Sequence, residues 1–523
     1  MLIQNFSVSF PFRRTHGKHR IIRIDLPIAQ SVKILSFAVS YWKWLRSVVP
    51  DELLIFAVFV LSHLFVTNYK PYSVLIFLYA SLLVIVTKDI SSSLWYATLG
   101  TLLFFKAKYF SIPFISSAAV SAGLTTETPF EYYISFSLML LALLIFSILR
   151  TRRGASVVLP LFWESILITL LLLIGSVSSS LSAFGAVSWF SLLIVVEYVL
   201  LFYVSIIMCS DKKVFFMSIR MIILFISLNA LLIVLQKLRG GPIGIILEDV
   251  SSGAFGRFPT ETPGFYRPGG IYFEPNLPAS LINLILPAAL YFVLTHIKGL
   301  VGVVLRMSLL MLLAALIATG SRANWAIGVI AMSTTAWYYR QKNTLLTIFT
   351  NPRFIIIIAI VLLLLLPTIF SRVSSVPTSF TGDTGGWQFR LRHITIAKDI
   401  ISTNIFGVGL DVFQYHILDH YSPTYYFSHF TAPHNVLAEV GSATGFIGLG
   451  VFISFFIVVL YRLFKNFKGD NTAASGINAA LLIGYATYLL SAQVYPWLFT
   501  PPLSELSWIV LGCLYAKTAA IKK

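Results

Sequence analysis

Long hydrophobic runs with few charges follow one another along the chain from about residue 50 onward. The runs 134–149 and 354–370 contain no charged residue, and a membrane-spanning helix needs about 20 mostly apolar residues. The pattern therefore predicts an all-α polytopic membrane protein with about 12–14 transmembrane helices. The candidate spans are 53–68, 72–87, 91–105, 131–149, 156–176, 186–209, 214–235, 277–296, 300–319, 324–338, 354–370, 443–461, 475–495 and 503–516.

The composition agrees with lipid as the solvent for most of the chain. Hydrophobic residues make up 57% and charged residues 11%, whereas soluble domains have about 45–50% and about 25%. This excess excludes a soluble enzyme, a disordered scaffold and a nucleic-acid-binding domain. The net charge of +18 is typical of basic loops that face the cytoplasm and anionic membrane lipids. Cys209 and Cys513 lie in apolar runs, so no disulfide framework is expected.

The distribution of Lys and Arg predicts the orientation. With the N-terminus inside, 24 of the 38 Lys and Arg residues fall on the inner side and 12 on the outer side. Positive residues concentrate on the cytoplasmic side of membrane proteins. We therefore expect a multi-pass protein with both termini in the cytoplasm. The sequence has no obvious repeat of the kind that builds inverted-repeat transporters.

The first 50 residues form a basic arm with eight Lys or Arg residues and a single acidic residue, Asp25. The arm lacks the apolar core and cleavage site of a secretory signal. We expect a cytoplasmic arm that is partly amphipathic over 34–44 and lies on anionic lipid. The alternative is a disordered tail whose only role is to set the topology.

Two outer connections are long, and long loops on a membrane scaffold usually carry function. The expected parts are the arm (1–50), an N-terminal transmembrane bundle (51–236), an outer loop (237–276), transmembrane helices (277–370), a large outer loop (371–442) and C-terminal transmembrane helices (443–523).

Within the large outer loop, residues 387–402 are expected to form an amphipathic helix that ends at Asn404 and Gly407. Its apolar side would consist of Phe389, Ile394, Ile396, Ile400 and Ile401.

Arginine residues on the outer side need an explanation, because this side should be poor in positive charge. Arg267 precedes a span, Arg322 lies in a short turn between two spans, and Arg390 and Arg392 lie on the loop helix. One hypothesis is a cationic pocket for a lipid-linked pyrophosphate, since guanidinium groups pair bidentately with phosphate. The alternative is that each Arg reaches lipid head groups or pairs with Asp or Glu.

His434 closes the large outer loop and precedes a helix that Asn435 could cap. A neutral imidazole here could accept the proton of an attacking hydroxyl as a general base. The alternative is a hydrogen-bonded structural histidine.

Other chemistry finds little support in the sequence. His416, His420 and His429 with Asp411 and Asp419 superficially resemble metal ligands, but no HExxH or CxxC pattern accompanies them, so we expect no metal and no cofactor. Nucleotide-binding and serine-hydrolase motifs are also missing from a suitable context. The energy for a reaction would therefore come from an activated lipid-linked substrate.

Four segments, in order, resemble motifs of the O-antigen ligase / O-antigen polymerase superfamily of bacterial membrane glycosyltransferases. They are 267–276 (Arg-Pro-Gly-Gly to Glu-Pro-Asn), 319–322 (Thr-Gly-Ser-Arg), 390–409 (a helix followed by Phe-Gly-Val-Gly) and 434–448 (His-Asn to Gly-Phe-Ile-Gly). The resemblance covers about residues 180–465. The chain departs from the family at Asn404-Ile405, where a proline usually precedes the Phe-Gly-Val-Gly stretch, and at Ile394, where an aromatic residue is common.

The resemblance implies a metal-independent glycosyltransferase of the multi-span class in the bacterial cytoplasmic (inner) membrane. It would transfer a glycan from a polyprenyl (undecaprenyl) diphosphate to an acceptor hydroxyl on the outer face, as an O-antigen ligase or polymerase in surface polysaccharide synthesis. The acceptor would belong to a glycan, a lipid or a protein. Whether the chain is a ligase or a polymerase stays open.

The resemblance also implies roles for individual residues. Arg267 and Arg322 would hold the diphosphate, His434 would activate the acceptor, and Arg390 would hold glycan or phosphate. Glu439 could orient the imidazole or the helix end, or could be a solvated helix residue without a role.

Two rival classes remain: a transporter or flippase for lipid-linked glycans, and a structural membrane subunit. A transporter usually places ionisable residues near the bilayer midplane, and here the charges in the middle of the runs are few (Glu164, Glu197, Arg220 and Arg306).

Overall fold

The computed structural model describes part of the chain. The described residues are mainly 6–12, 20–26, 89–102, 109–111, 133–135, 161–244, 266–295, 299–339, 386–420, 433–467, 473–495 and 503–520, with single positions around 49–57, 141–148 and 363–370 and without Phe273. The chain divides into two compact units, Met1–Leu54 and Ile55–Lys523, which we describe separately.

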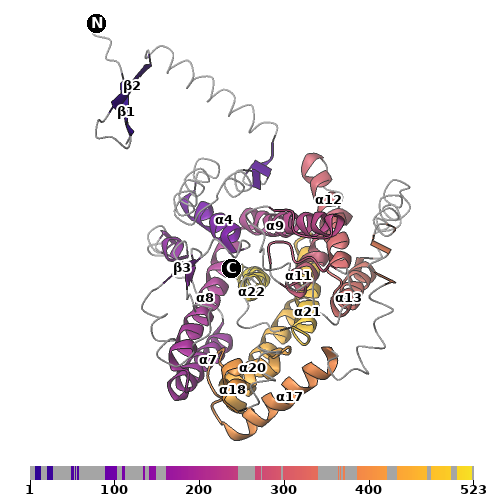
Figure 1. Cartoon of the computed structure of the whole chain (residues 1–523). Coiled ribbons are helices and arrows are strands. Elements are labelled where there is room, and N and C mark those ends of the chain that lie inside the picture. The colour runs from indigo at the N-terminus through magenta and orange to yellow at the C-terminus, as the bar shows by residue number, and fades with distance from the viewer. Residues whose placement is uncertain are drawn as a thin grey trace. The chain divides into compact units, whose positions relative to one another are not determined.

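The second unit is a bundle of helices (Figure 1), which confirms an all-α polytopic membrane protein. Six described helices are long and apolar enough to cross a membrane, and the helix bounds agree with the expected spans to within a few residues over most of the described chain. The helices are α4 (Ile90–Leu102), α7 (Phe162–Leu181), α8 (Gly185–Cys209), α9 (Lys212–Arg239), α11 (Asn276–Leu294), α12 (Gly299–Ala318), α13 (Arg322–Tyr339), α17 (Gly386–Thr403), α18 (Phe413–His420), α20 (Val436–Phe467), α21 (Ala473–Ser491) and α22 (Leu503–Ala520).

Most of the expected spans 53–68, 72–87 and 354–370 lies outside the described residues. The total of 12–14 spans therefore stays a prediction.

Large apolar side chains point away from the protein on several of these helices. On α7 Phe162 is 67% exposed, and on α20 Ile457 is 63% exposed. A water-soluble protein rarely exposes contiguous apolar surface of this kind. These faces therefore fit contact with lipid tails, as expected for a bundle that crosses a membrane.

Short strands are the main departure from the expected structure. In the N-terminal unit, β1 (Phe6–Phe12) pairs antiparallel with β2 (Arg20–Leu26), in a register that places Phe6 opposite Leu26. Apolar residues alternate with polar ones over Phe6–Phe10, and this period of two favours a strand. The alternative of a wholly disordered arm is therefore wrong for these residues, whereas 34–44 lies outside the described residues.

A second small sheet pairs β3 (Tyr109–Ser111) with β4 (Tyr133–Ser135). The expected span 131–149 is therefore wrong at its start, which is a strand. The aromatic and β-branched residues Tyr133 and Ile134 fit a strand better than a helix.

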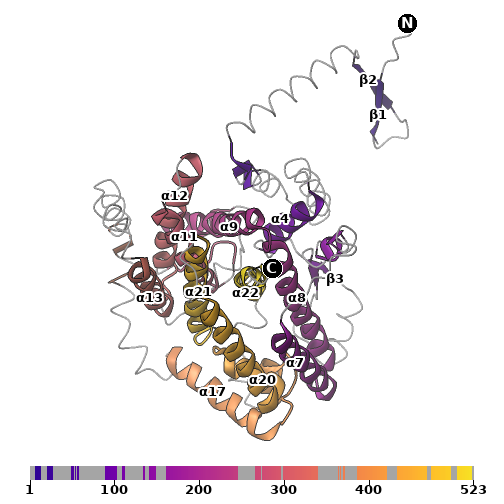
Figure 2. The ribbon, with the colours of Figure 1, turned by 180° about the vertical axis from the view of Figure 1, so that it is seen from behind.

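Helix α11 is the core of the bundle (Figures 1 and 2). It is buried along its length and packs against α9, α12, α13 and α21. Pro287 lies inside it and cannot donate to the carbonyl of Asn283, four residues earlier. The hydroxyl of Thr487 on α21 donates to that carbonyl at 3.4 Å, so a neighbouring helix satisfies the group that the proline leaves exposed.

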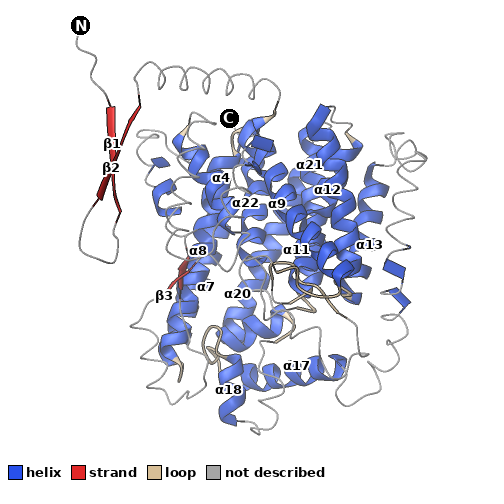
Figure 3. Cartoon of the chain, turned by 45° about the horizontal axis from the view of Figure 1, so that its top comes forward, coloured by secondary structure: helices blue, strands red, loops and turns tan. Residues whose placement is uncertain are grey.

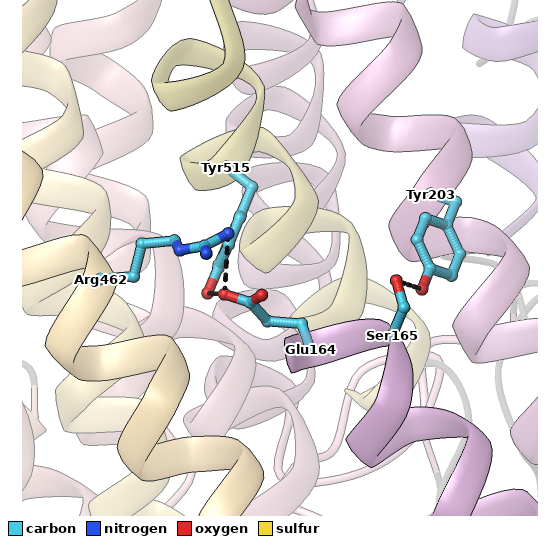
Figure 4. A network of polar contacts seen from close by, with 5 residues as sticks. All are labelled: Glu164, Ser165, Tyr203, Arg462 and Tyr515. Carbon is cyan, nitrogen blue, oxygen red and sulfur yellow. Dashed lines mark hydrogen bonds and ion pairs between the residues drawn. The ribbon is translucent and has the colours of Figure 1, made fainter. Parts of the chain in front are cut away.

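A charged group inside the bundle joins α7, α20 and α22 (Figure 4). Glu164 on α7 is fully buried, and its Oε1 atom lies 3.1 Å from Nη1 of Arg462 on α20. The hydroxyl of Tyr515 on α22 donates to the same oxygen at 3.0 Å. Beside this network, Ser165 and Tyr203 share a 2.8 Å hydrogen bond between α7 and α8.

We expect the substitution Arg462→Met to lower the free energy of unfolding by about 2–3 kcal/mol, because it leaves the carboxyl of Glu164 buried without its cation. The matched control Tyr203→Phe removes one neutral hydrogen bond and should cost about 1 kcal/mol. Thermal unfolding of both purified variants in detergent measures the difference. Equal melting temperatures for the two variants would show that the ion pair stabilises the fold no more than one neutral hydrogen bond does.

Candidate functional site

The candidate site residues gather at one end of the bundle, where several helices begin or end. Helices α11, α13 and α20 begin there, and α12 and α21 end there. Hydrogen bonds tie these ends together: Ser491 Oγ, on α21, donates to Asn324 Oδ1, on α13, at 2.9 Å. Asn435, just before α20, donates to Gln493 Oε1, just after α21, at 3.1 Å.

Two amide side chains of α9 fix the backbone beside Arg267. Gln236 donates to the carbonyl of Gly270 and accepts from its N–H, both at 2.9 Å. Asn229 Oδ1 accepts from the N–H of Ile271 at 2.8 Å. These contacts satisfy the polar backbone of a loop that has no regular structure of its own.

Arg267 joins the first two sequence motifs. Its Nε atom donates to the carbonyl oxygen of Thr319 at 3.1 Å, and Nη2 donates to Asn276 Oδ1 at 3.3 Å. Thr319 belongs to the turn that leads into Arg322, the first residue of α13. The structure thus brings Arg267 next to the turn that carries Arg322.

The start of α13 is held in place by buried amides. Asn283 on α11 donates to both the backbone carbonyl and Oδ1 of Asn324, at 3.1 and 3.0 Å. Asn324 in turn donates to Ser321 Oγ at 3.0 Å. The position of Arg322 is therefore fixed by residues of a buried core helix.

Glu274 lies between the arginine residues, although the sequence analysis gave it no role. Its Oε1 atom accepts from Asn276 Nδ2 at 2.6 Å, and it also forms a side-chain hydrogen bond with Tyr495. The charges of Arg267 and Arg390 lower the pKa of Glu274, but burial outweighs them and the pKa is raised above its usual value.

Helix α17 forms as expected and lies crosswise beneath α20 (Figure 3). Ile396, Ala397 and Ile400 form its buried side. Ile394 is 42% exposed, so its expected place on the apolar side is wrong. Arg390 is partly buried near Glu274, whereas Arg392 is exposed. The two arginines therefore separate, and only Arg390 faces the site.

His434 lies among aromatic rings at this end of the bundle. Its ring stacks on that of His393 at 6.4 Å with an interplanar angle of 10°, and the ring of Tyr495 lies 6.2 Å away. Burial, followed by the charge of Arg390 and by His393, lowers the pKa of His434 to about 3. The imidazole is therefore neutral at physiological pH, as a general base requires.

Asn435 and Glu439 follow on the first turns of α20. Asn435 Oδ1 accepts from the N–H groups of Leu437 and Ala438, so it caps the helix. Glu439 is 3% exposed, so the reading as a solvated helix residue is wrong. Its charge acts on Asp411 and on Tyr495. Burial and the charge of Glu439 raise the pKa of Asp411 to about 7.

The third and fourth motifs dock on one another through their backbones. Helix α20 leaves the helical conformation at Gly445, where φ is +69°. The N–H of Val408 donates to the carbonyl of Ser442 at 2.9 Å, and the N–H of Gly409 donates to that of Ala443 at 3.2 Å. A Cβ atom at Gly445 would lie 2.0 Å from the carbonyl oxygen of Ile405. These two glycine-rich segments therefore fix α17 on α20.

We expect Gly445→Ala to cost at least about 2 kcal/mol of folding free energy, because the left-handed backbone and the contact with Ile405 both exclude a side chain. Gly450→Ala, in the same helix, is the matched control. Nothing lies within 4 Å of a Cβ atom there, so this change should be neutral or slightly stabilising. The melting temperatures of the two variants measure the difference in stability. A Gly445→Ala protein as stable as Gly450→Ala would contradict the tight docking.

The structure thus brings Arg267, Arg390 and His434 near one another, next to the turn that carries Arg322, and their roles stay predictions. Three further residues were missed. His393 lies three residues after Arg390, a spacing that places both on one helix face. Tyr495 lies at the end of an expected span, and Glu274 lies inside the first motif.

Within the described residues, no group of three or more His, Cys, Asp or Glu side chains could hold a metal ion. Of the five residues that superficially resemble metal ligands, Asp411 and His416 are described with their side chains. His429 lies outside the described residues, as do the side chains of Asp419 and His420.

Comparison with known families adds an independent result. The helices define a polytopic all-α membrane protein, and residues 307–453 match the family model described as O-antigen ligase. This match confirms the resemblance to the O-antigen ligase/polymerase superfamily. No curated protein matches the chain. The matched segment includes α13, α17 and most of α20, and so contains Arg322, Arg390 and His434.

The family supports a role in glycan transfer of the O-antigen ligase/polymerase type. The matched family is one of glycosyltransferase-like membrane enzymes, and its partners are in general a lipid-linked glycan and an acceptor.

Proposed function

We propose that the protein transfers a glycan from undecaprenyl diphosphate to an acceptor hydroxyl at the outer face of the bacterial inner membrane. The acceptor hydroxyl attacks the anomeric carbon, the bond to the diphosphate breaks, and the lipid diphosphate leaves. The observation that carries the proposal is the cluster of Arg267, Arg390 and neutral His434 at one end of the bundle, next to the turn of Arg322.

In this proposal the arginines provide the catalytic electrostatics. The leaving diphosphate gains negative charge as the glycosidic bond breaks, and fixed cations that face this charge lower the barrier. Arg322 and Arg267 hold the diphosphate, and Arg390 holds its outer phosphate or the first sugar. Because guanidinium groups provide this stabilisation, the reaction needs no metal ion.

His434 activates the acceptor in the same proposal. Its imidazole is neutral and accepts the hydroxyl proton while the diphosphate leaves. Asn435 fixes the helix start that carries His434, and Glu439 supports this end of α20 from inside. We place both termini in the cytoplasm because inner connections hold twice as many Lys and Arg residues as outer ones.

A transporter or flippase for the same lipid-linked glycan is the second candidate. It would need ionisable groups along a path through the bundle. The buried carboxyl of Glu164 already has Arg462 and Tyr515 as partners, which favours a structural role for it. A structural subunit without chemistry would not need a neutral, partly buried histidine near Arg390.

The first functional prediction concerns the donor. Arg322→Lys should weaken binding of the lipid diphosphate about tenfold or more, because an ammonium group cannot form the bidentate contact. The matched control is Arg392→Lys, at an exposed position on α17, which should bind like the wild type. Binding is measured with a short-chain polyprenyl diphosphate glycan in detergent micelles. Full binding by Arg322→Lys would remove this residue from the diphosphate site.

The second functional prediction concerns His434. His434→Ala should reduce transfer by about 10²–10⁴-fold at saturating donor, while donor binding remains. The control His416→Ala, on α18, should remain active. A folded His434→Ala protein with normal turnover would exclude it as the base.

Because the pKa of His434 is lowered to about 3, its imidazole stays neutral down to that pH. Turnover at saturating donor should therefore not fall near pH 6.5, where an ordinary histidine gains a proton. Asp411, whose pKa is raised to about 7, can titrate in this range, and the pKa of Glu274 is raised as well, so the pH profile is best recorded in a variant that carries both Asp411→Asn and Glu274→Gln. A loss of turnover near pH 6.5 in that variant would contradict a neutral base.

A further inference from the structure

Glu274 is an acidic side chain on which the charges of both Arg267 and Arg390 act. It is linked to Arg267 through Asn276, which accepts from the arginine and donates to the carboxylate. On its other side it meets the hydroxyl of Tyr495. A carboxyl group thus lies among the groups that, in the proposed function, surround the diphosphate.

The groups around Glu274 act in opposite directions on the ionisation of its carboxyl group. Arg267 comes from its own loop, Arg390 from α17, and Tyr495 from the segment after α21. One step further out, Glu439 and His434 both lie near Tyr495. The cations favour the carboxylate, whereas burial favours the neutral carboxylic acid and raises the pKa.

From this geometry we propose that Glu274 is a positioning residue that regulates donor affinity: as a carboxylate it balances Arg267 and Arg390 when the donor is absent, and it takes up a proton when the diphosphate binds. The inference rests on the proposed function, because it requires a diphosphate between these arginines. The proton comes from solvent and returns there when the lipid diphosphate leaves.

The direction in which donor affinity changes with pH follows from the proton that binds together with the donor. A bound diphosphate places negative charge near Glu274, which favours the protonated carboxyl group and raises its pKa further. The bound state then holds more protons than the empty site, so donor affinity falls as pH rises. Near neutral pH the charged carboxylate repels the product diphosphate and speeds its release.

A regulatory role and a purely structural role for Glu274 predict opposite changes in donor affinity when its charge is removed. If Glu274 only held the arginines in place, its loss would weaken donor binding. If its charge competes with the diphosphate, removal of the charge strengthens binding. The isosteric substitution Glu274→Gln keeps the hydrogen-bonding shape and removes only the charge, so it separates the two cases.

The experiment measures binding of a short-chain polyprenyl diphosphate glycan to the full-length protein between about pH 6 and pH 9. The phosphates of this probe carry no second acidic proton of the kind that titrates near pH 6, so its charge stays constant. We expect the donor affinity of the wild type to fall as pH rises. Glu274→Gln should bind the donor about tenfold more tightly than the wild type at pH 8, and its affinity should not change with pH. Its turnover should fall because product release slows. The control Glu197→Gln, at another buried carboxyl group, should keep the wild-type slope.

A second variant tests the same inference without changing Glu274. The hydrogen bond from Tyr495 lowers the pKa of Glu274, so Tyr495→Phe should shift the fall in donor affinity to higher pH. Weaker or equal binding by Glu274→Gln, or an unchanged midpoint in Tyr495→Phe, would overturn the role of Glu274. Failure of the wild-type protein to bind the polyprenyl diphosphate probe at any pH would instead overturn the proposed function, so the two failures are distinguishable.

Discussion

The hydrogen bond from Arg267 to the carbonyl oxygen of Thr319 is the contact on which the site depends. It joins a loop before α11 to the turn between α12 and α13, two segments 52 residues apart. The contact is possible only because Gln236 and Asn229 on α9 fix the backbone of the loop. In a membrane, where water cannot satisfy such groups, polar side chains on neighbouring helices must do so. The site is therefore built from the ends of helices that are mostly apolar along their length.

The four motifs divide into two kinds once their contacts are known. The segments around Arg267 and Arg322 place charged side chains at the bundle end. The Phe-Gly-Val-Gly stretch and the glycine-rich part of α20 bind one another through backbone atoms. This docking positions α17, and with it Arg390 and His393, against the start of α20. Glycines that carry no chemistry thereby determine whether Arg390 can reach His434.

Much of the helix pattern could be predicted from the sequence, because a span in lipid must be long and apolar. The helix of residues 387–402 was also predictable, from the spacing of its apolar residues. Its exact buried side was not: Ile394 faces outward, whereas His393 is fully buried. A polar ring is buried there because Phe413 and His434 pack against it, and such tertiary partners leave no signal in local periodicity. Glu274 was overlooked for the same reason, since its meaning depends on Arg390, which lies far away along the chain.

The charges in the cluster indicate how much the base and how much the arginines would contribute to lowering the barrier of the proposed reaction. Arg390 lowers the proton affinity of His434, so the imidazole is always available as a base but is a weak one. A weak base accepts a proton efficiently only when the acceptor hydroxyl has already become acidic through attack on the anomeric carbon. In the proposed reaction, departure of the diphosphate would therefore lead the proton transfer, and arginines that stabilise the departing charge would provide most of the barrier reduction. The charge of the same arginine that weakens the base also acts on Glu274, so Arg390 links the proposed base to this carboxyl group.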